Sequence, residues 1–195
     1  MTDALHIDKT VLAPAMELLP SRMNSDRARV ALLAICGQES DFHHRWQVID
    51  RARPHVRGPA RGLWQFERGG GVLDVLTHRA SRDLAREVCA ERGVAPNSEA
   101  VHLALETDDV LAACFARLLL WTDPQPLPPL GAVSSAFALY LRAWRPGAYD
   151  RGSQNQRAEL RRKWDVYYAQ ALEAVTGRAD FSGVTTQFDS SARRA

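Results

Sequence analysis

The chain has 195 residues, of which 46% are hydrophobic, and its 25 basic against 23 acidic side chains give a formal net charge of +2. This balance of charge and apolar content excludes an intrinsically disordered protein and suits one domain with a sizeable core. The low net charge argues against nucleic acid as a partner. No apolar run reaches the roughly 18 residues of a membrane-spanning helix, so we expect no stable membrane insertion.

The N-terminal part of the chain has a helical periodicity. Residues 11–19 predict a short helix that ends at Pro20. Ser25 is a typical capping residue for the next helix, and apolar side chains fill nearly every position over residues 30–36. A helix that is apolar on almost all sides is a central, buried one, and this helix is expected to end within residues 37–40.

The middle of the chain changes from an irregular stretch back to helices. Glycine and proline punctuate residues 50–71, so any strands are expected as a minor hairpin near residues 50–66. Helical patterns resume over residues 72–78 and 81–92, and a further helix over residues 109–121 carries an apolar stripe on one side.

Two long helices are predicted in the C-terminal part. The prolines of residues 124–129 indicate a stiff extended connector. A helix over residues 133–144 follows and stops before Pro146. Ser153 and Gln156 form a capping box for the last long helix.

These elements predict a mainly helical, all-α domain over residues 1–177, followed by a polar tail over residues 178–195. The cysteines are Cys36, Cys89 and Cys114, which are widely spaced and lie in apolar helical settings. Such cysteines are expected as buried thiols and not as a zinc or thioredoxin motif.

Glu39 is a candidate reactive group, because a carboxylate is unexpected directly at the end of the most apolar helix. It lies within the segment 38–42, Gln-Glu-Ser-Asp-Phe, and the loop 58–66 follows. That loop combines glycines with the aromatic Trp64 and the amide Gln65. Close backbone approach, a stacking face and an amide are what a groove for an uncharged polar ligand needs.

The two segments resemble a known pattern, that of the soluble lytic transglycosylases and goose-type lysozymes, which cleave peptidoglycan. The family pattern is Glu-Ser-x-Phe followed by Gly-x-x-Gly-Leu-(Met/Trp)-Gln. Its counterparts here are Glu39, Ser40 and Phe42, then Gly58, Gly62, Leu63, Trp64 and Gln65, with residues 59–61 between the two glycines. A third family element, a helix ending Ala-Tyr-Asn-x-Gly, has a looser counterpart over residues 137–147. There Tyr140 matches the tyrosine, whereas Leu141 stands in place of the asparagine.

The resemblance implies a lysozyme-like helical domain whose groove binds the glycan strand of peptidoglycan. It also implies that Glu39 is the catalytic acid and base, that Tyr140 hydrogen-bonds it, and that Gln65 and Ser40 position the substrate. A general acid must stay protonated near neutral pH, so its carboxyl must be partly shielded from water. We expect Phe42 to contribute to this shielding and to belong to the substrate-binding residues.

The tryptophans near the motif are candidate sugar-stacking residues. Trp64 is the first candidate and Trp46 the second, although a place in the core is an alternative for each. Trp64 is also a candidate for shielding Glu39 from water. Gly62 would let the backbone approach the ligand closely.

The reaction depends on whether a second carboxylate is present. Hydrolysis by a lysozyme normally uses two carboxylates, whereas a lytic transglycosylase needs one. The candidates for a second one, Asp41, Asp50 and Glu67, lie in no obviously apolar setting. We therefore expect lytic transglycosylation of the MurNAc–GlcNAc β-1,4 bond, which forms 1,6-anhydro-MurNAc. The alternatives are a hydrolytic lysozyme (muramidase) and a non-catalytic glycan-binding or virion structural protein, which the replacement by Leu141 favours.

The sequence also bears on delivery and on further ligands. Residues 1–10 have no apolar run typical of a Sec signal, so we expect synthesis in the cytoplasm and action on a bacterial cell wall. Holin-dependent release or virion assembly would reconcile the two, as for a phage endolysin.

Neither a metal nor a cofactor is expected, because His43 and His44 are adjacent and share no helix face. Residues 69–71, all glycine, indicate a flexible groove rim. The basic residues of 157–163 predict a solvated face or an attachment to anionic wall polymers.

Overall fold

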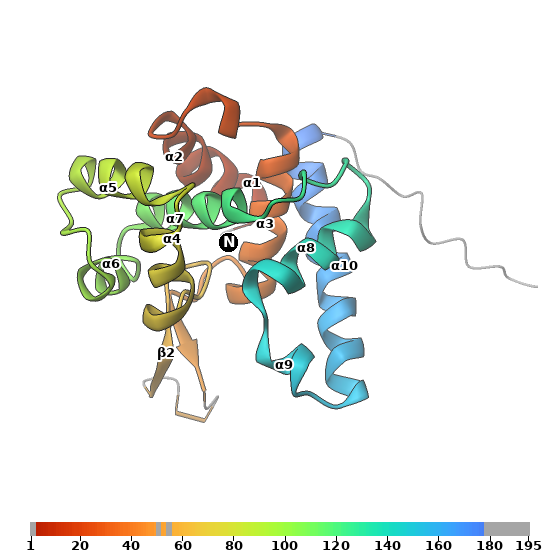
Figure 1. The fold of residues 1–195 in the computed structure, drawn as a ribbon. Coiled ribbons are helices and arrows are strands. Elements are labelled where there is room, and N and C mark those ends of the chain that lie inside the picture. Colours follow the sequence, from red (N-terminus) through yellow and green to blue (C-terminus); the bar gives the residue numbers. More distant parts are fainter. Residues whose placement is uncertain (1–2, 50–51, 54–55, 178–195) are drawn as a thin grey trace, which may run out of the picture.

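The computed structural model describes residues 3–49, 52–53 and 56–177. Over these residues the chain is mainly helical with one small antiparallel hairpin, which confirms the predicted fold class (Figure 1). The helices are α1 (Ala4–Ile7), α2 (Ala13–Glu17), α3 (Asp26–Ser40), α4 (Leu73–Thr77), α5 (Arg82–Glu91), α6 (Ser98–Ala104), α7 (Asp109–Thr122), α8 (Val133–Trp144), α9 (Gly147–Asp150) and α10 (Gln154–Thr176). Shorter helical turns are η1 (Asp8–Leu12), η2 (Ser21–Met23) and η3 (Arg68–Val72), and the strands are β1 (Trp46–Val48) and β2 (Arg57–Arg61).

Two predictions concern a membrane-spanning helix and the C-terminal limit of the domain. None of the described helices is long and apolar enough to cross a membrane. The predicted tail over residues 178–195 lies outside the described residues.

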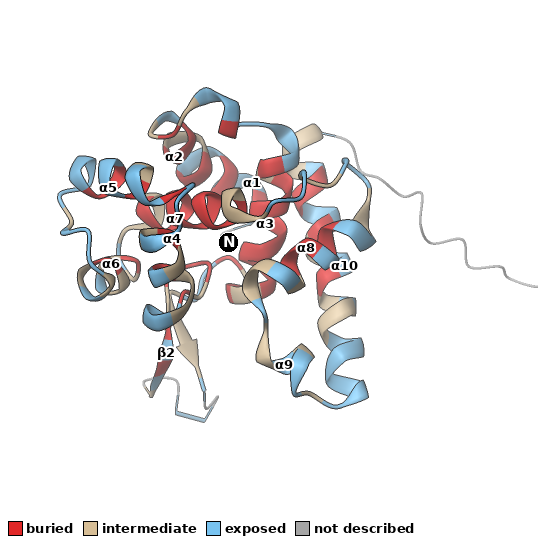
Figure 2. Ribbon diagram, in the orientation of Figure 1, coloured by how far each residue is buried: buried red, intermediate tan, exposed pale blue. Residues whose placement is uncertain are grey.

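Helix α3 lies at the centre of the molecule, as predicted (Figure 2). Its N-terminus is capped by Ser25, whose hydroxyl accepts a hydrogen bond from the N–H of Ala28 at 3.3 Å. Residues 30–38 are all buried, because α10 packs along one side of the helix and α7 contacts another. Burial of this stretch places the C-terminal end of α3, which carries Glu39, among other elements and away from bulk solvent.

Helix α10 has the predicted capping box. The Ser153 hydroxyl accepts from the N–H of Gln156 at 3.3 Å, and the Gln156 side chain accepts from the N–H of Ser153 at 2.8 Å. The helix ends at Gly177, which has the left-handed φ of 66° that glycine adopts without strain. The long contact between α10 and α3 gives the catalytic candidate a rigid support.

Helix α8 carries an aromatic cluster against α10. Tyr140 is buried and stacks on Trp164, with ring centroids 5.1 Å apart and an interplanar angle of 20°. Phe137 packs on the same tryptophan at 5.6 Å. The helix ends at Arg145, whose φ of 48° turns the chain toward Pro146. Tyr140 is therefore fixed by ring contacts with Trp164 and with Phe137, whose ring centroid lies 6.0 Å from its own.

The hairpin is the part whose limits the sequence predicted least well. β1 pairs antiparallel with β2, with Trp46 opposite Arg61 and Val48 opposite Arg57. The predicted range of 50–66 contains the second strand, but the first strand lies ahead of it. Strand pairing selected this register, and the local glycine and proline pattern does not report that pairing.

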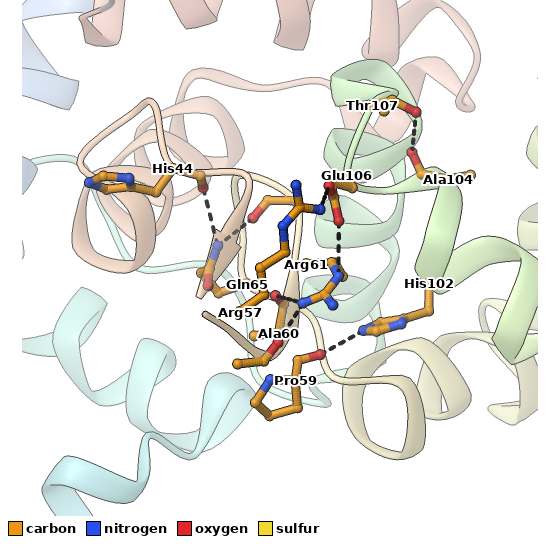
Figure 3. A network of polar contacts seen from close by, with 12 residues as sticks. His44, Arg57, Pro59, Ala60, Arg61, Gln65, His102, Ala104, Glu106 and Thr107 are labelled. Atoms are coloured by element: carbon orange, nitrogen blue, oxygen red, sulfur yellow. Dashed lines mark hydrogen bonds and ion pairs between the residues drawn. The ribbon is translucent and has the colours of Figure 1, made fainter. Parts of the chain in front are cut away.

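Polar contacts tie the hairpin to α6 and the turn after it (Figure 3). Glu106 forms ion pairs with Arg57 and with Arg61, the latter at 3.0 Å. The His102 imidazole Nε2 lies 2.8 Å from the Pro59 carbonyl oxygen. These contacts hold one wall of the cavity described next.

Candidate active site

A cavity of about 660 Å³ opens beside the C-terminal end of α3. The hairpin, η3 and α4 line one side of it, and α8 with the segment around α9 lines the other (Figure 1). We call it the Glu39 cavity. Its lining includes Gln38, Glu39, Gln47, Gln65, Phe66, Glu67, Gly69, Gly70, Gly71, Asp74, Tyr140, Trp144, Arg145, Gly147, Arg151 and Leu160.

Glu39 is the half-buried acid of this cavity. The Tyr140 hydroxyl donates a hydrogen bond to its Oε1 at 2.7 Å. Burial raises the pKa of Glu39 to about 7, and the hydrogen bond from Tyr140 and the positive charge of Lys163 oppose this rise. The carboxyl therefore exchanges its proton near neutral pH, as a group that must act both as acid and as base requires.

Tyr140 is the neutral partner of this pair. Burial, together with the adjacent Glu39 carboxylate, raises the pKa of its hydroxyl far above the ordinary value. The hydroxyl thus remains a hydrogen-bond donor wherever the carboxylate is ionised. The predicted contact between Tyr140 and Glu39 is confirmed.

Gln65 is the third predicted residue that lines the cavity, after Glu39 and Tyr140. Its φ of 50° is unusual for a residue with a side chain. The side-chain NH2 donates to the carbonyl oxygens of Gly62 at 2.9 Å and His44 at 3.1 Å (Figure 3). Over the described residues its side-chain oxygen has no hydrogen bond, so this acceptor is available to a ligand.

Ser40 and Phe42 do not belong to the cavity lining, contrary to the expectation that they contact the substrate. Ser40 is buried, and its hydroxyl donates to the Cys36 carbonyl oxygen at 2.9 Å. Phe42 is buried against Tyr167, with ring centroids 5.3 Å apart. Helical geometry turns Ser40 back onto its own helix, so it does not reach a substrate in the cavity.

Trp64 and Gly62 are also core residues. Trp64 is 0% exposed and its indole N–H donates to the Leu32 carbonyl oxygen at 2.9 Å. A ring with no exposed surface offers no face to a sugar, so its predicted stacking role is not supported. Gly62 is buried with a φ of 74°, and a Cβ there would lie 2.7 Å from the Leu105 carbonyl oxygen. Its glycine is explained by backbone geometry and packing.

Trp144 is a further aromatic residue of the cavity lining, beside Phe66 and Tyr140, and the sequence analysis assigned it no role in the site. It is half-buried, and its indole N–H donates to the Trp64 carbonyl oxygen at 3.0 Å. Its ring lies 6.0 Å from that of Phe66. Trp46, the other tryptophan considered, lies on β1 under the guanidinium of Arg57 at 4.4 Å and does not belong to the lining.

Two amide side chains of the lining were also missed. The side-chain oxygens of Gln38 and Gln47 are buried and lack a hydrogen-bond partner within the described part of the chain. Buried acceptors of this kind are usually paired. The position of Gln38 and Gln47 beside Glu39 is visible only after the hairpin has folded against α3 and α8.

The candidates for a second carboxylate, Asp41, Asp50 and Glu67, differ in their position relative to the cavity. Asp41 lies outside the cavity lining, and it accepts a hydrogen bond from Tyr167 at 2.6 Å and an ion pair from Lys163 at 3.1 Å. Although burial opposes them, these contacts hold the pKa of Asp41 below its ordinary value. Asp50 lies outside the described residues. Glu67 lines the cavity and is exposed.

The structure also bears on three further predicted features, which are metal binding, the glycines of residues 69–71 and the basic face of α10. Among the described residues no group of three or more His, Cys, Asp or Glu side chains could hold a metal ion. The glycines of residues 69–71 line the cavity wall. On the basic face of α10, Arg161 pairs with Asp165 and Arg162 with Glu159.

Comparison of the chain with protein-family models, curated proteins and solved structures found no match. The site is therefore interpreted from its own geometry and chemistry.

Proposed function

We propose that this protein is a lytic transglycosylase that degrades peptidoglycan at the MurNAc–GlcNAc β-1,4 bond. The observation that carries the proposal is the Glu39 carboxyl, held by Tyr140 in a cavity and given a pKa of about 7 by burial. The resemblance of the segments around Glu39 and Gln65 to the transglycosylase pattern supports the same activity.

The reaction needs one carboxyl group that changes its protonation state. Protonated Glu39 gives its proton to the glycosidic oxygen, and the bond from that oxygen to C1 of MurNAc breaks. The carboxylate then takes the proton of the C6 hydroxyl as the C6 oxygen bonds to C1. This step forms the 1,6-anhydro ring and returns Glu39 to its protonated form, so no water is consumed. Tyr140 holds the carboxyl in one orientation through both steps.

The remaining lining suits a sugar chain. A sugar offers hydroxyl and N-acetyl N–H donors, which the side-chain oxygen of Gln65 can accept. Trp144 supplies an aromatic surface, which suits the apolar face of a sugar ring.

Hydrolysis by a lysozyme-type reaction is the second candidate, and the presence of Glu67 in the same cavity favours it. A second carboxylate could act as the base that activates water. Glu67 is exposed, and no contact ties it to Glu39 in the described residues.

The test uses purified sacculi and two variants. Glu39→Gln keeps the shape of the side chain but has no proton to exchange, so it should clear walls at least about a thousandfold more slowly, in line with loss of general acid–base catalysis. Glu159→Gln, an exposed site on α10, is the matched control and should keep parent activity. Parent-like clearing by Glu39→Gln would refute the proposal.

Mass spectrometry of the soluble products separates the two reactions. Anhydromuropeptides indicate transglycosylation, and reducing muropeptides indicate hydrolysis. If hydrolysis is found, Glu67→Gln should abolish it, whereas a transglycosylase should tolerate this change.

A further inference from the structure

Two arginines of the Glu39 cavity come from the short segment between α8 and α10. Arg145 is already paired with Asp74, at 2.8 Å across the cavity. Arg151, which directly follows α9, is exposed, and its guanidinium makes no hydrogen bond or ion pair with any described residue. It therefore presents a free positive charge to a ligand in this cavity.

The segment that carries Arg151 is anchored on both sides. The Arg157 guanidinium donates to the Tyr149 carbonyl oxygen at 2.7 Å. The Tyr149 ring packs edge-on against Phe137 at 5.9 Å. Gly152 allows a tight approach to Ala148, because a Cβ there would overlap the Ala148 carbonyl.

The guanidinium itself has a defined place. It lies over Gly147, where a Cβ would overlap its nitrogen. The glycine thus leaves room for Arg151 to lie along the cavity edge, and even alanine at this position would push the guanidinium away. A substitution of Gly147 would therefore displace the positive charge of Arg151 without removing it.

On the opposite wall, at the start of η3, the carboxylate of Glu67 makes no hydrogen bond or ion pair with any described residue. Like charges repel, so an anionic group of a ligand would be disfavoured near Glu67 and favoured near Arg151. These two charges belong to segments on opposite sides of the cavity. They would orient a ligand that has an acidic part.

On the basis of the proposed function, we propose that Arg151 binds a carboxylate of the stem peptide attached to the glycan, so that the cavity selects peptide-bearing strands. Where a stem peptide is attached to the lactyl group, the sugars of peptidoglycan carry no charge. The carboxylates of peptidoglycan then lie on the peptide. A guanidinium matches a carboxylate in charge and in its two-oxygen geometry.

The experiment compares two forms of one substrate. Sacculi are acetylated at their amino groups, and half of the preparation is then amidated at its peptide carboxylates. The two forms differ in charge but hardly in size. The parent protein should cleave the carboxylate form with a kcat/KM about tenfold higher, as expected for one charge-assisted hydrogen-bonded contact.

Four variants assign this preference. Arg151→Gln should lose the tenfold preference by slowing only on the carboxylate form, and Arg151→Lys should keep most of it because it keeps the charge. Gly147→Ala should reduce it by displacing the guanidinium. Arg27→Gln, at an exposed site on α3 outside the cavity, is the matched control and should behave as the parent.

A second measurement separates this inference from the proposed function. Affinity for soluble, un-crosslinked peptide-bearing strands, with and without amidation, is measured in the Glu39→Gln background, where no cleavage is needed. Absence of cleavage by the parent would refute the proposed function, while the binding data would still test Arg151. Equal effects of Arg151→Gln on both forms, or no effect on either, would overturn the inference.

Discussion

Replacing Tyr140 with phenylalanine removes one hydrogen bond from the Glu39 carboxyl and leaves the ring that stacks on Trp164. The lost bond, 2.7 Å long, stabilises the ionised carboxylate more than the protonated acid and therefore lowers the pKa of Glu39. Its removal raises that pKa above the present value of about 7.

The size of the change follows from the kind of bond. A hydrogen bond to a charged group is worth about 1.5–3 kcal/mol, and about 1.4 kcal/mol corresponds to one pKa unit. The pKa of Glu39 should rise by about one to two units. Because the acid works in its protonated form, the pH at which kcat/KM falls on the alkaline side should rise by the same amount.

The assay is the rate of release of soluble fragments from sacculi between about pH 5 and about pH 10, which spans the expected shift of one to two units. Tyr167→Phe is the control, because Tyr167 makes an equivalent hydrogen bond to Asp41 outside the cavity. An alkaline limb that stays in place in Tyr140→Phe, or that moves to lower pH, would refute the assignment of Glu39 as the general acid.

Three other predictions test separate parts of the structure. Burial raises the pKa of Glu39 from 4.5 to about 7, so the folded state favours the protonated form of this carboxyl. The contribution of Glu39 to the free energy of unfolding is therefore fully present below pH 4.5 and is lost as the pH rises to about 7. Glu39→Gln should therefore increase the free energy of unfolding by about 2–3 kcal/mol more at pH 8 than at pH 4, measured by urea titration; a gain independent of pH would contradict this. Gly62→Ala should destabilise the fold by about 2 kcal/mol or more, because of its left-handed φ of 74° and the contact with Leu105. Gly93→Ala, with a φ of 66° and open space, should cost less; equal losses would show that the contact is unimportant. Trp144→Leu should raise KM about three- to tenfold by removing the aromatic surface, and an unchanged KM in steady-state kinetics would remove Trp144 from the binding surface.

The elements that the sequence predicted best are those whose signals are local. Helical periodicity and the Ser25 cap located α3, and the Ser153–Gln156 capping box located the start of α10. Such signals involve residues within one or two turns of each other, so they act before any tertiary contact forms. The hairpin was placed less well, because its register depends on pairing between two short strands.

The site was predicted in part. Glu39, Tyr140 and Gln65 line the cavity, as the sequence analysis expected of substrate-contacting residues. Ser40 and Trp64 belong to the same local motif, but their side chains are buried in the core. A motif states which residue types are neighbours along the chain, and it does not state which of them face solvent.

By itself, the sequence determined a helical domain built on a central apolar helix, with a carboxyl group at the end of that helix. Only the tertiary structure decided which side chains meet that carboxyl. Tyr140 and Glu39 are 101 positions apart, and their hydrogen bond forms because α3 and α8 both pack on α10. The same packing buries Trp64, exposes Trp144 to the cavity and leaves Arg151 at its edge. Burial also raises the pKa of Glu39, and burial is a property of the folded chain because it depends on residues that are distant in sequence.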